Sequence, residues 1–600
     1  MKKLFLYSFL LAASFAAVSA QNKQITLEEI WGGAFRTQGM DALHSMKNGK
    51  QYTVLNYNRN SRVFTIDKYN YQTLEKTETL VSTETLNELS KIDNYHFSED
   101  ESKLMLATGT EPIYRHSTLA HYFVYTLENK QLVKVSEEKI QEPLLSPDGS
   151  KVAYVLNNNI FIKNLGTGET VQVTSDGEKN KIINGVADWV YEEEFSFVRA
   201  FAWNKTGSHI AFLRFDETHV PEFSMDVYGN ELYPTQQRFK YPKAGEKNAE
   251  VTLHLYDTTL KSTQNIDLAD AYYIPRIEWT NDANVLSIQV LNRHQNHLKL
   301  YFFSIKNKEA KVVLNETDKA YVDVTDNLTF LNDNSFIWTS EKDGYNHIYH
   351  YSKEGELFRQ VTSGPWEVTA YYGFDPKTAR IFYQSVENGS INRDVYSIGL
   401  NGKGKKRLST QTGTNSAVFS ADFSYFINSY QNTQTPNQFT LHDSKSGNKL
   451  KDIVTNSELS EELKSYEIAA KEFSTIQING NDLNMWMIKP KDFDPNKKYP
   501  LFMFQYSGPG SQQVANRWHG ANDYWYQMLA QKGYIIACVD GRGTGFKGAE
   551  FKKETYKELG KYEVEDQIAA AKKLGELPYI DASRIGIWGW SYGGFMSSNA

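Results

Sequence analysis

The run Arg584-Ile585-Gly586-Ile587-Trp588 leads directly into Gly589-Trp590-Ser591-Tyr592-Gly593 near the end of the 600-residue chain. The first five residues are typical of a short apolar strand, and the next five form the Gly-x-Ser-x-Gly pattern of a nucleophile elbow. The flanking glycines permit a turn that is too tight for side chains, and the strained backbone lifts the Ser591 hydroxyl clear of the sheet. The sequence therefore predicts a reactive serine between a strand and a helix.

A change of pattern near residue 471 predicts that this elbow belongs to an α/β-hydrolase domain over residues 471–600. Strand-like runs alternate there with helical stretches, which is typical of a parallel sheet. The strand-like runs are residues 484–488, 501–505, 534–539 and 584–588, and the helical stretches are about residues 523–531 and 562–574. A serine hydrolase of this type takes its Asp and His from later in the chain. Because the sequence stops at Ala600, we expect an incomplete domain, with the triad Asp and His beyond this residue.

Length and composition indicate a folded protein of at least two domains. Six hundred residues exceed what one hydrophobic core usually organises. Hydrophobic residues make up 40% of the chain, and 38 Tyr and 33 Phe against 15 Pro favour β-rich structure. A net charge of −7 without a basic block argues against nucleic acid as a partner.

The first twenty residues have the pattern of a secretory signal peptide. A basic start (residues 1–3) precedes an apolar run (residues 4–18), and Ala17-Val18-Ser19-Ala20 resembles a cleavage site after Ala20. The apolar run is shorter than the roughly 20 residues of a membrane span, so we expect no span after the signal is removed. Because Cys538 is the only cysteine, the exported chain folds without disulfides. This combination indicates a bacterial protein of the periplasm or cell surface.

A repeated pattern between about residues 46 and 470 predicts a β-propeller. In each unit an apolar or aromatic residue leads into a polar turn and then into an alternating strand. The leading residues are Met46, Phe97, Leu145, Trp203, Trp279, Phe330, Phe374 and Phe419. Periods near 40–50 residues are the signature of propeller blades, whereas a β-sandwich has turn signals every 8–12 residues. We expect eight blades, although a count of seven stays open because the first match is weak. The long interval from Trp203 to Trp279 predicts an insertion.

Two groups near the elbow are candidates for stabilising an oxyanion. The backbone N–H of Tyr592 follows the nucleophile directly and is the usual first donor. The second donor is expected in the loop after an earlier strand, where Tyr506 follows the run 501–505. The phenol hydroxyl of Tyr506 can donate to an oxyanion, and the alternative is a buried aromatic residue with a satisfied hydroxyl.

An acidic run lies within the predicted propeller, at Asp188-Trp189-Val190-Tyr191-Glu192-Glu193-Glu194-Phe195. Most charge runs are solvated faces, but the flanking aromatic residues indicate that this segment is packed. Adjacent carboxylates repel one another, and a bound cation such as the terminal ammonium of a peptide relieves that repulsion. Arg115 could contact a substrate carbonyl, although an ion pair with these carboxylates is the simpler interpretation. The His pairs of the chain have no acid or cysteine in ligand spacing, so we assign no metal site and no cofactor.

These motifs resemble those of the dipeptidyl peptidase IV group, within the prolyl oligopeptidase class of serine peptidases. The resemblance covers most of the mature chain and depends on residues 114–117, 188–194, 241–245, 506–509, 540–545, 563–568 and 587–594. It implies an eight-bladed β-propeller that caps an α/β-hydrolase domain, with a short N-terminal segment (about residues 21–45) joining the hydrolase. It also implies release of dipeptides from peptides with a free N-terminus and Pro or Ala second, and a homodimer.

The resemblance also implies roles for individual residues. Ser591 matches the nucleophile, and the Tyr592 N–H and the Tyr506 hydroxyl match the oxyanion hole. Glu193 and Glu194 match the pair that binds the substrate ammonium, which leaves Glu192 a structural role. Arg115 matches the arginine that contacts the carbonyl of the substrate's first residue. The Asp, the His and most of the pocket for Pro are expected beyond Ala600.

The paired carboxylates would act as a ruler for the product length. An extended chain places the attacked carbonyl of the second residue roughly 7 Å from the terminal amine. A tripeptidyl peptidase or a broader prolyl peptidase on the same scaffold stays open as an alternative. A non-catalytic propeller protein that binds peptides is a further alternative, which Ser591, Tyr506 and the acidic run disfavour.

Overall fold

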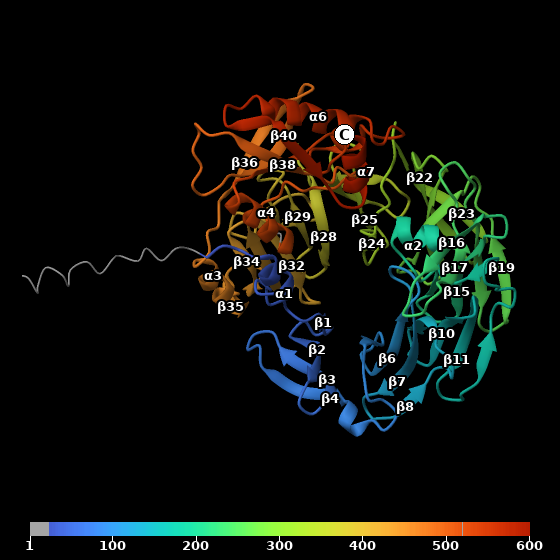
Figure 1. Cartoon of the computed structure of the whole chain (residues 1–600). Helices are drawn as coiled ribbons and strands as arrows, with labels where there is room; N and C mark the ends of the chain where they lie inside the picture. The colour runs from blue at the N-terminus through green and yellow to red at the C-terminus, as the bar shows by residue number, and fades with distance from the viewer. Residues whose placement is uncertain (1–22, 519) are drawn as a thin grey trace, which may run out of the picture.

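The computed structural model describes residues 23–518 and 520–600 of the chain. The signal peptide expected at residues 1–20 lies outside the described residues. Eight small antiparallel sheets follow one another around a ring, and a separate mixed sheet with helices lies above them in Figure 1. The prediction of an eight-bladed β-propeller with an α/β-hydrolase domain is thereby confirmed.

Each of the eight sheets is one blade, and its strands follow one another in chain order. The first four blades are β1–β4 (Leu43–Ser45, Gln51–Asn58, Val63–Asn70, Lys76–Ser82), β5–β8 (Asn94–Phe97, Lys103–Pro112, Thr118–Thr126, Leu132–Lys134), β9–β12 (Gln141–Leu145, Lys151–Leu156, Asn159–Asn164, Thr170–Gln172) and β13, β14, β15, β18 and β19 (Ile182–Asn184, Phe201–Trp203, His209–Asp216, Glu250–Asp257, Ser262–Ile266). The last four are β20–β23 (Tyr273–Trp279, Val285–Leu291, His297–Ser304, Glu309–Thr317), β24–β27 (Thr329–Phe330, Phe336–Ser340, His347–Tyr351, Leu357–Gln360), β28–β31 (Val368–Asp375, Arg380–Ser385, Asp394–Gly399, Lys406–Arg407) and β32–β35 (Thr414–Phe419, Tyr425–Asn432, Thr435–Asp443, Lys449–Val454).

The repeat residues lie at or next to the end of a strand at one edge of each blade, and this strand is as short as two residues in β24. Trp203 and Trp279 close β14 and β20, and each indole N–H donates to a carbonyl of the preceding blade, at 3.2 Å for Leu144 and 3.1 Å for Ala202. The polar turn that follows has a fixed hydrogen-bond pattern. In the third blade, Oδ1 of Asp148 accepts from the hydroxyls of Ser146 and Ser150. Each repeat in the sequence therefore corresponds to one polar turn and, at Trp203 and Trp279, to a hydrogen bond between neighbouring blades.

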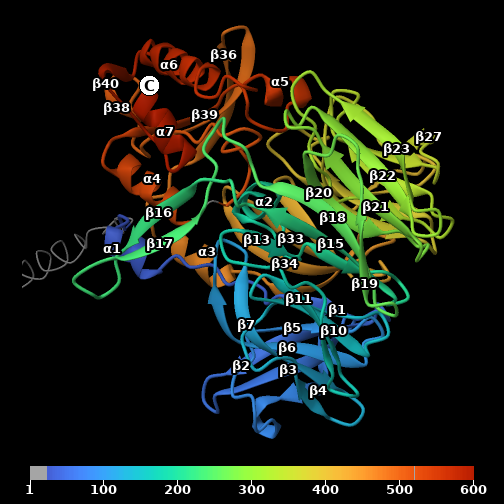
Figure 2. The ribbon, with the colours of Figure 1, turned by 90° about the vertical axis from the view of Figure 1, so that its right-hand side faces the viewer.

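The long interval between Trp203 and Trp279 carries a separate hairpin. Strands β16 (Glu222–Val227) and β17 (Thr235–Lys240) pair only with each other and lie between β15 and β18 in the chain. Figure 2 shows this green hairpin extending away from its blade. Its base packs on the short helix α2 (Trp189–Phe195), where the rings of Trp189 and Tyr241 lie 4.5 Å apart. The insertion expected from the sequence is therefore built against the acidic run.

The sheet of the hydrolase domain is mixed, in the order β36-β37-β39-β38-β40. Its strands are β36 (Lys471–Ile478), β37 (Asn481–Ile488), β38 (Tyr499–Phe504), β39 (Ile535–Asp540) and β40 (Ile580–Trp588). Strands β38, β39 and β40 are parallel, whereas β37 pairs antiparallel with both β36 and β39. The expectation of a parallel sheet was therefore wrong for the run 484–488. This strand follows β36 through a tight turn, and a two-strand hairpin is necessarily antiparallel.

Helices cover this sheet and connect its strands. They are α4 (Ala521–Gln531), α5 (Ala549–Lys553), α6 (Tyr562–Gly575) and α7 (Tyr592–Asn599). No helix among the described residues is long and apolar enough to cross a membrane.

The beginning of the described chain packs on the hydrolase helices. Helix α1 (Leu27–Gly32) starts with a capping box between Thr26 and Glu29. Phe35 stacks on Tyr524 of α4 with ring centroids 4.3 Å apart, in a cluster that also includes α3 (Ser457–Leu463). Figure 1 shows blue α1 beside orange α4. The division of the chain into residues 21–45, 46–470 and 471–600 stays a prediction.

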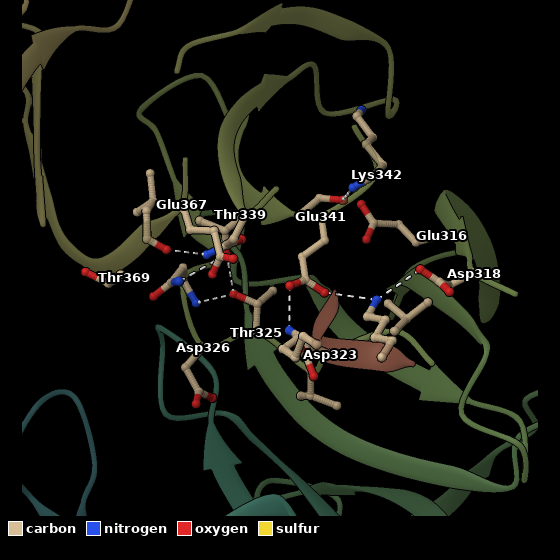
Figure 3. Close-up of a pocket in the computed structure, with 18 of the residues that line it drawn as sticks. Glu316, Asp318, Asp323, Thr325, Asp326, Thr339, Glu341, Lys342, Glu367 and Thr369 are labelled. Atoms are coloured by element: carbon tan, nitrogen blue, oxygen red, sulfur yellow. Dashed lines mark hydrogen bonds and ion pairs between the residues drawn. The ribbon is translucent and has the colours of Figure 1, made fainter. Parts of the chain in front are cut away.

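A group of ion pairs joins the two parts of the molecule beside a cavity of about 520 Å³. Lys552 and Lys553 of α5 point into the fifth and sixth blades, and both contact the half-buried carboxylate of Glu341. Lys552 also pairs with Asp323, and Nζ of Lys553 lies 2.9 Å from the carboxylate of Asp318. Figure 3 shows Glu341 between its two lysine contacts. We call these five residues the α5 latch.

Candidate active site

The Gly-x-Ser-x-Gly motif forms a tight turn between β40 and α7. Ser591 has φ +57° and ψ −118°, a conformation that side chains rarely adopt, and its side chain is exposed. The end of β38 passes so close that a β carbon at Gly589 would lie 2.4 Å from the carbonyl oxygen of Gln505. A β carbon at Gly593 would lie 2.6 Å from the same atom. Both glycines are therefore required by close packing, and the strained backbone presents the serine hydroxyl.

Tyr506 lies beside this turn, directly after the close approach of Gln505. Its ring centroid is 6.2 Å from that of Tyr592. A β carbon at Gly508 would lie 2.5 Å from the Tyr506 ring, so this glycine leaves room for the ring. No hydrogen bond of the Tyr506 hydroxyl occurs within the described residues. The structure thus brings Ser591, Tyr592 and Tyr506 together, and the phenol hydroxyl beside the predicted nucleophile has no hydrogen bond among the described residues.

The side chain of Tyr592 is fixed by a buried carboxylate. Its hydroxyl donates to Oε1 of Glu563 at 2.7 Å, and Oε2 of Glu563 accepts from the backbone N–H of Gly560 at 3.0 Å. Burial, and then this hydrogen bond, raise the pKa of Tyr592 far above its usual range. The sequence analysis includes Glu563 only within the run 563–568 and predicts no role for it.

The acidic run folds as α2 because its first residue caps the helix. Oδ1 of Asp188 accepts from the backbone N–H of Tyr191 at 2.9 Å. The Tyr191 hydroxyl in turn accepts from the backbone N–H of Ile274 at 3.1 Å, in a fully buried position. This anchoring buries Tyr191 and Glu192, and it leaves Glu193 and Glu194 on the open side of α2.

Glu192 ties α2 to the loop that carries Arg115. Its Oε1 accepts from the backbone N–H groups of His116 at 2.7 Å and of Ser117 at 2.9 Å. With only 2% of the residue exposed, this carboxylate is a structural element of the propeller. The bond holds the loop between β6 and β7 against the helix, so that Arg115 lies next to Glu193.

Arg115 and Glu193 form an ion pair at the surface of this site. Nε of Arg115 lies 2.8 Å from Oε2 and 3.1 Å from Oε1 of Glu193. The hydrogen bond to Glu193 raises the pKa of Arg115, and the phenol oxygen of Tyr506 adds a smaller electrostatic contribution. Figure 1 shows α2, the helix that carries Glu193, on the side of the propeller that lies toward α7 of the hydrolase domain.

Of the two acids on the open side of α2, Glu194 is the one without a partner among the described residues. No hydrogen bond or ion pair of its carboxylate occurs within the described residues. Partial desolvation, and then the negative charge of Glu193, raise its pKa above the ordinary value. A positive group placed here would remove the repulsion between the two carboxylates.

Two further acids near α2, Asp188 and Glu217, are buried. Burial raises the pKa of Asp188 to about 6 and that of Glu217 to about 7. Glu217 lines a cavity of about 600 Å³. Tyr114 borders the same cavity, and burial followed by the charge of Glu217 raises its pKa to about 12. Among the described residues, no group of three His, Cys, Asp or Glu side chains is arranged to hold a metal ion.

Comparison with known proteins identifies the family. The model of the dipeptidyl peptidase IV (DPP IV) N-terminal region matches residues 98–437, and that of the prolyl oligopeptidase family matches residues 522–600. The chain belongs to the dipeptidyl peptidase IV family. The resemblance noted in the sequence is thereby confirmed, and the family supports serine dipeptidyl peptidase activity in general.

Solved structures and curated relatives of the dipeptidyl peptidase IV family are similar along almost the whole chain. Porphyromonas gingivalis dipeptidyl peptidase 4 is 43% identical and superposes with a TM-score of 0.91 over 96% of this chain and 82% of that chain. Human prolyl endopeptidase FAP is 32% identical over 96% of this chain and 78% of its own length. A probable dipeptidyl peptidase 4 of Arthroderma benhamiae is 33% identical over 84% of this chain and 68% of its own length.

Proposed function

We propose that this protein is a serine exopeptidase that releases N-terminal Xaa-Pro and Xaa-Ala dipeptides from peptides through an acyl-enzyme. The observation that carries the proposal is the ion pair between Arg115 and Glu193, beside Glu194, at the helix α2 that lies toward α7. In this proposal, a binding group for a free amine and a group for acyl transfer belong to one site. Such a site selects the ends of peptides and excludes internal bonds.

The two carboxylates of α2 would hold the substrate ammonium. Glu194 offers an unpaired carboxylate, and Glu193 offers the face that Arg115 leaves open. An ammonium group donates three hydrogen bonds and carries the charge that relieves the repulsion between these acids. Arg115 would then donate to the carbonyl oxygen of the first substrate residue, because its guanidinium carries five N–H donors and only its Nε is hydrogen-bonded to Glu193.

The chemistry would follow the pattern of serine acyl transfer. The Oγ of Ser591 attacks the carbonyl carbon of the second residue, and the resulting oxyanion accepts from the Tyr592 N–H and the Tyr506 O–H. The leaving amine takes a proton, and water then hydrolyses the ester. The resemblance implies that the base is a His, oriented by an Asp, and that this His takes the Ser591 proton and passes it to the leaving amine.

The product of a defined peptide tests this proposal. Full-length protein incubated with a peptide that begins Gly-Pro is expected to release Gly-Pro, identified by mass spectrometry, and to leave an N-acetylated copy intact. Release of a tripeptide would favour a tripeptidyl peptidase, and cleavage of the acetylated copy would reject binding of the free amine. Absence of any product, together with binding of the peptide, would favour a non-catalytic propeller.

We also propose that the protein is exported to the periplasm or cell surface and acts as a homodimer. Export rests on the pattern of residues 1–20, and dimerisation rests on the family resemblance. Sequencing of the N-terminus of the mature protein is expected to begin at Gln21. Light scattering after gel filtration is expected to give twice the mass of one chain.

A further inference from the structure

Gln505 is a buried amide at the junction of the three segments that form the candidate oxyanion hole. It directly precedes Tyr506, and its backbone N–H donates to the carbonyl of Trp588 at the end of β40, at 3.1 Å. Its side-chain Nε2 donates to the carbonyl of Gly593 at 2.7 Å and to the hydroxyl of Ser597 at 3.0 Å. One residue therefore connects the strand before Ser591 with the helix after it.

The backbone of Gln505 packs directly against the turn that contains Ser591. No side chain separates Gln505 from Gly589 and Gly593, because a β carbon at either position would overlap the Gln505 carbonyl oxygen. At Gly593 the same β carbon would also lie 3.2 Å from the Cα of Tyr506. The backbones of residues 505–506 and 589–593 thus touch directly, and a shift of one segment is transmitted to the other.

The Oε1 atom of Gln505 is buried and has no hydrogen-bond partner within the described residues. A buried acceptor without a partner costs about 1–3 kcal/mol, which an apolar side chain of equal size would avoid. The opposite orientation of the amide would place Oε1 against the carbonyl oxygen of Gly593, where two acceptors repel. The unsatisfied oxygen therefore indicates that the contribution of Gln505 lies in its two N–H bonds to α7.

We propose that Gln505 is a positioning residue that sets the distance between the two oxyanion donors. One donor, the Tyr506 hydroxyl, belongs to the residue that follows Gln505. The other donor, the N–H of Tyr592, belongs to the residue before Gly593, whose carbonyl accepts from the Gln505 side chain. Each donor is thus one residue from an atom fixed by Gln505. Because a donor acts only within about 2.7–3.1 Å of the oxyanion, a small slide of α7 along β38 would separate the pair. This inference rests on the proposed function only in assigning the two donors.

The substitution Gln505→Met in the full-length protein tests the inference. Methionine has nearly the same volume and length but cannot donate to Gly593. We expect kcat on a Gly-Pro chromogenic substrate to fall at least about 10-fold, a part of the 10²–10³-fold effect of losing a donor outright. KM is expected to stay within about 2-fold, because the ammonium site does not involve Gln505. Gln505→Asn, which keeps the amide but is one methylene shorter, is expected to show a smaller fall in kcat.

A second buried amide provides the matched control. Gln527 in α4 donates from Nε2 to the carbonyl of Ala469 at 2.9 Å and lies outside the elbow. Gln527→Met removes the same kind of donated bond and also the bond that Oε1 accepts from the Ala469 N–H at 2.8 Å, so it is expected to lower the melting temperature and to leave kcat unchanged. An equal fall of kcat in the Gln505 and Gln527 variants would overturn the inference, as would an unchanged kcat in Gln505→Met.

The labelling rate of Ser591 by a fluorophosphonate separates this inference from the proposed function. The reagent needs neither a free amine nor a proline, and its phosphoryl oxygen occupies the oxyanion hole. Slower labelling of Gln505→Met than of Gln527→Met supports the role of Gln505 even if the protein releases no dipeptide. Equal labelling rates reject that role even if the wild-type protein does release dipeptides.

Discussion

The guanidinium of Arg115 and the carboxylate of Glu193 come from different blades, and their charged atoms lie 2.8 Å apart. Arg115 lies in the loop between β6 and β7 of the second blade, whereas Glu193 lies in α2, which precedes β14 of the fourth. In the proposed site, the blades supply one half, and Ser591 and Tyr506 of the hydrolase domain supply the other.

Glu194→Gln is expected to lower kcat/KM on a Gly-Pro chromogenic substrate by about 10²-fold or more, because the ammonium loses one of its two negative partners. Folding is expected to be unchanged, since this carboxylate makes no hydrogen bond within the described residues. Glu137→Gln, an exposed acid of the second blade, is the control and is expected to keep full activity. Steady-state kinetics of both variants test this prediction, and equal kcat/KM values would show that Glu194 does not bind the substrate ammonium.

Glu192→Ala is expected to act through the loop that carries Arg115. Its carboxylate accepts from the N–H groups of His116 and Ser117, and alanine would leave both donors buried without a partner. We expect a raised KM for the dipeptide substrate and a lower melting temperature. Glu192→Gln, which keeps one acceptor oxygen, is expected to restore part of both quantities. A variant that loses stability while KM stays at the wild-type value would limit Glu192 to folding.

Several of these relationships could be predicted from the sequence, and others could not. The turns that follow Trp203 and Trp279 repeat along the chain, so the propeller could be inferred from local pattern alone. The elbow at Ser591 is equally local. The pairing of Glu192 with residues 116 and 117 depends on contacts across more than 70 positions, and no local pattern records it. The same is true of Gln505, whose role appears only when the carbonyl of Gly593 is placed beside it.

The hydrolase sheet shows a second kind of limit. Residues 484–488 have the apolar pattern of a buried strand, and burial on both faces gives the same pattern in parallel and antiparallel strands. Their direction is set by the tight turn after β36, in which Gly480 has φ +81°. The turn contains Asn479-Gly480, a dipeptide typical of a two-residue hairpin, so the sequence did carry a signal for the antiparallel direction that the apolar pattern alone lacks.

The α5 latch is expected to align the two halves of the site. In Glu341→Gln, the amide oxygen keeps one lysine contact and the other is lost, while Asp318 and Asp323 still pair with their lysines. Loss of a charged hydrogen bond at this half-buried position is expected to cost about 2 kcal/mol. Because dipeptide release needs both halves, kcat/KM is expected to fall more than the rate of fluorophosphonate labelling, which needs only the hydrolase. Parallel falls of the two rates would contradict an aligning role.

The exposed pair of Glu354 and Lys353 supplies the control for the latch. Their charged atoms lie 3.7 Å apart, with 63% of the Glu354 side chain exposed. Surface pairs of this kind contribute little, so Glu354→Gln is expected to change neither rate nor stability. Both variants remove one carboxylate from the sixth blade, and the comparison therefore isolates the contact with α5 from the change in net charge.

The stability of the propeller is expected to fall as the pH rises from about 4.5 to 7, because Glu217 has a raised pKa. In the unfolded chain this acid ionises near 4.5, whereas burial holds its pKa near 7 in the folded protein. The folded state therefore binds more protons across this window, and stability declines with pH by about 3 kcal/mol at most from this group. Glu217→Gln is expected to melt at a higher temperature than the wild type at pH 8 and to lose that advantage at pH 4. Glu178→Gln removes the same charge at the exposed rim of the same cavity and is expected to show no such crossover. Melting curves of the three proteins at both pH values would reveal it, and parallel pH dependences of wild type and Glu217→Gln would contradict the assignment.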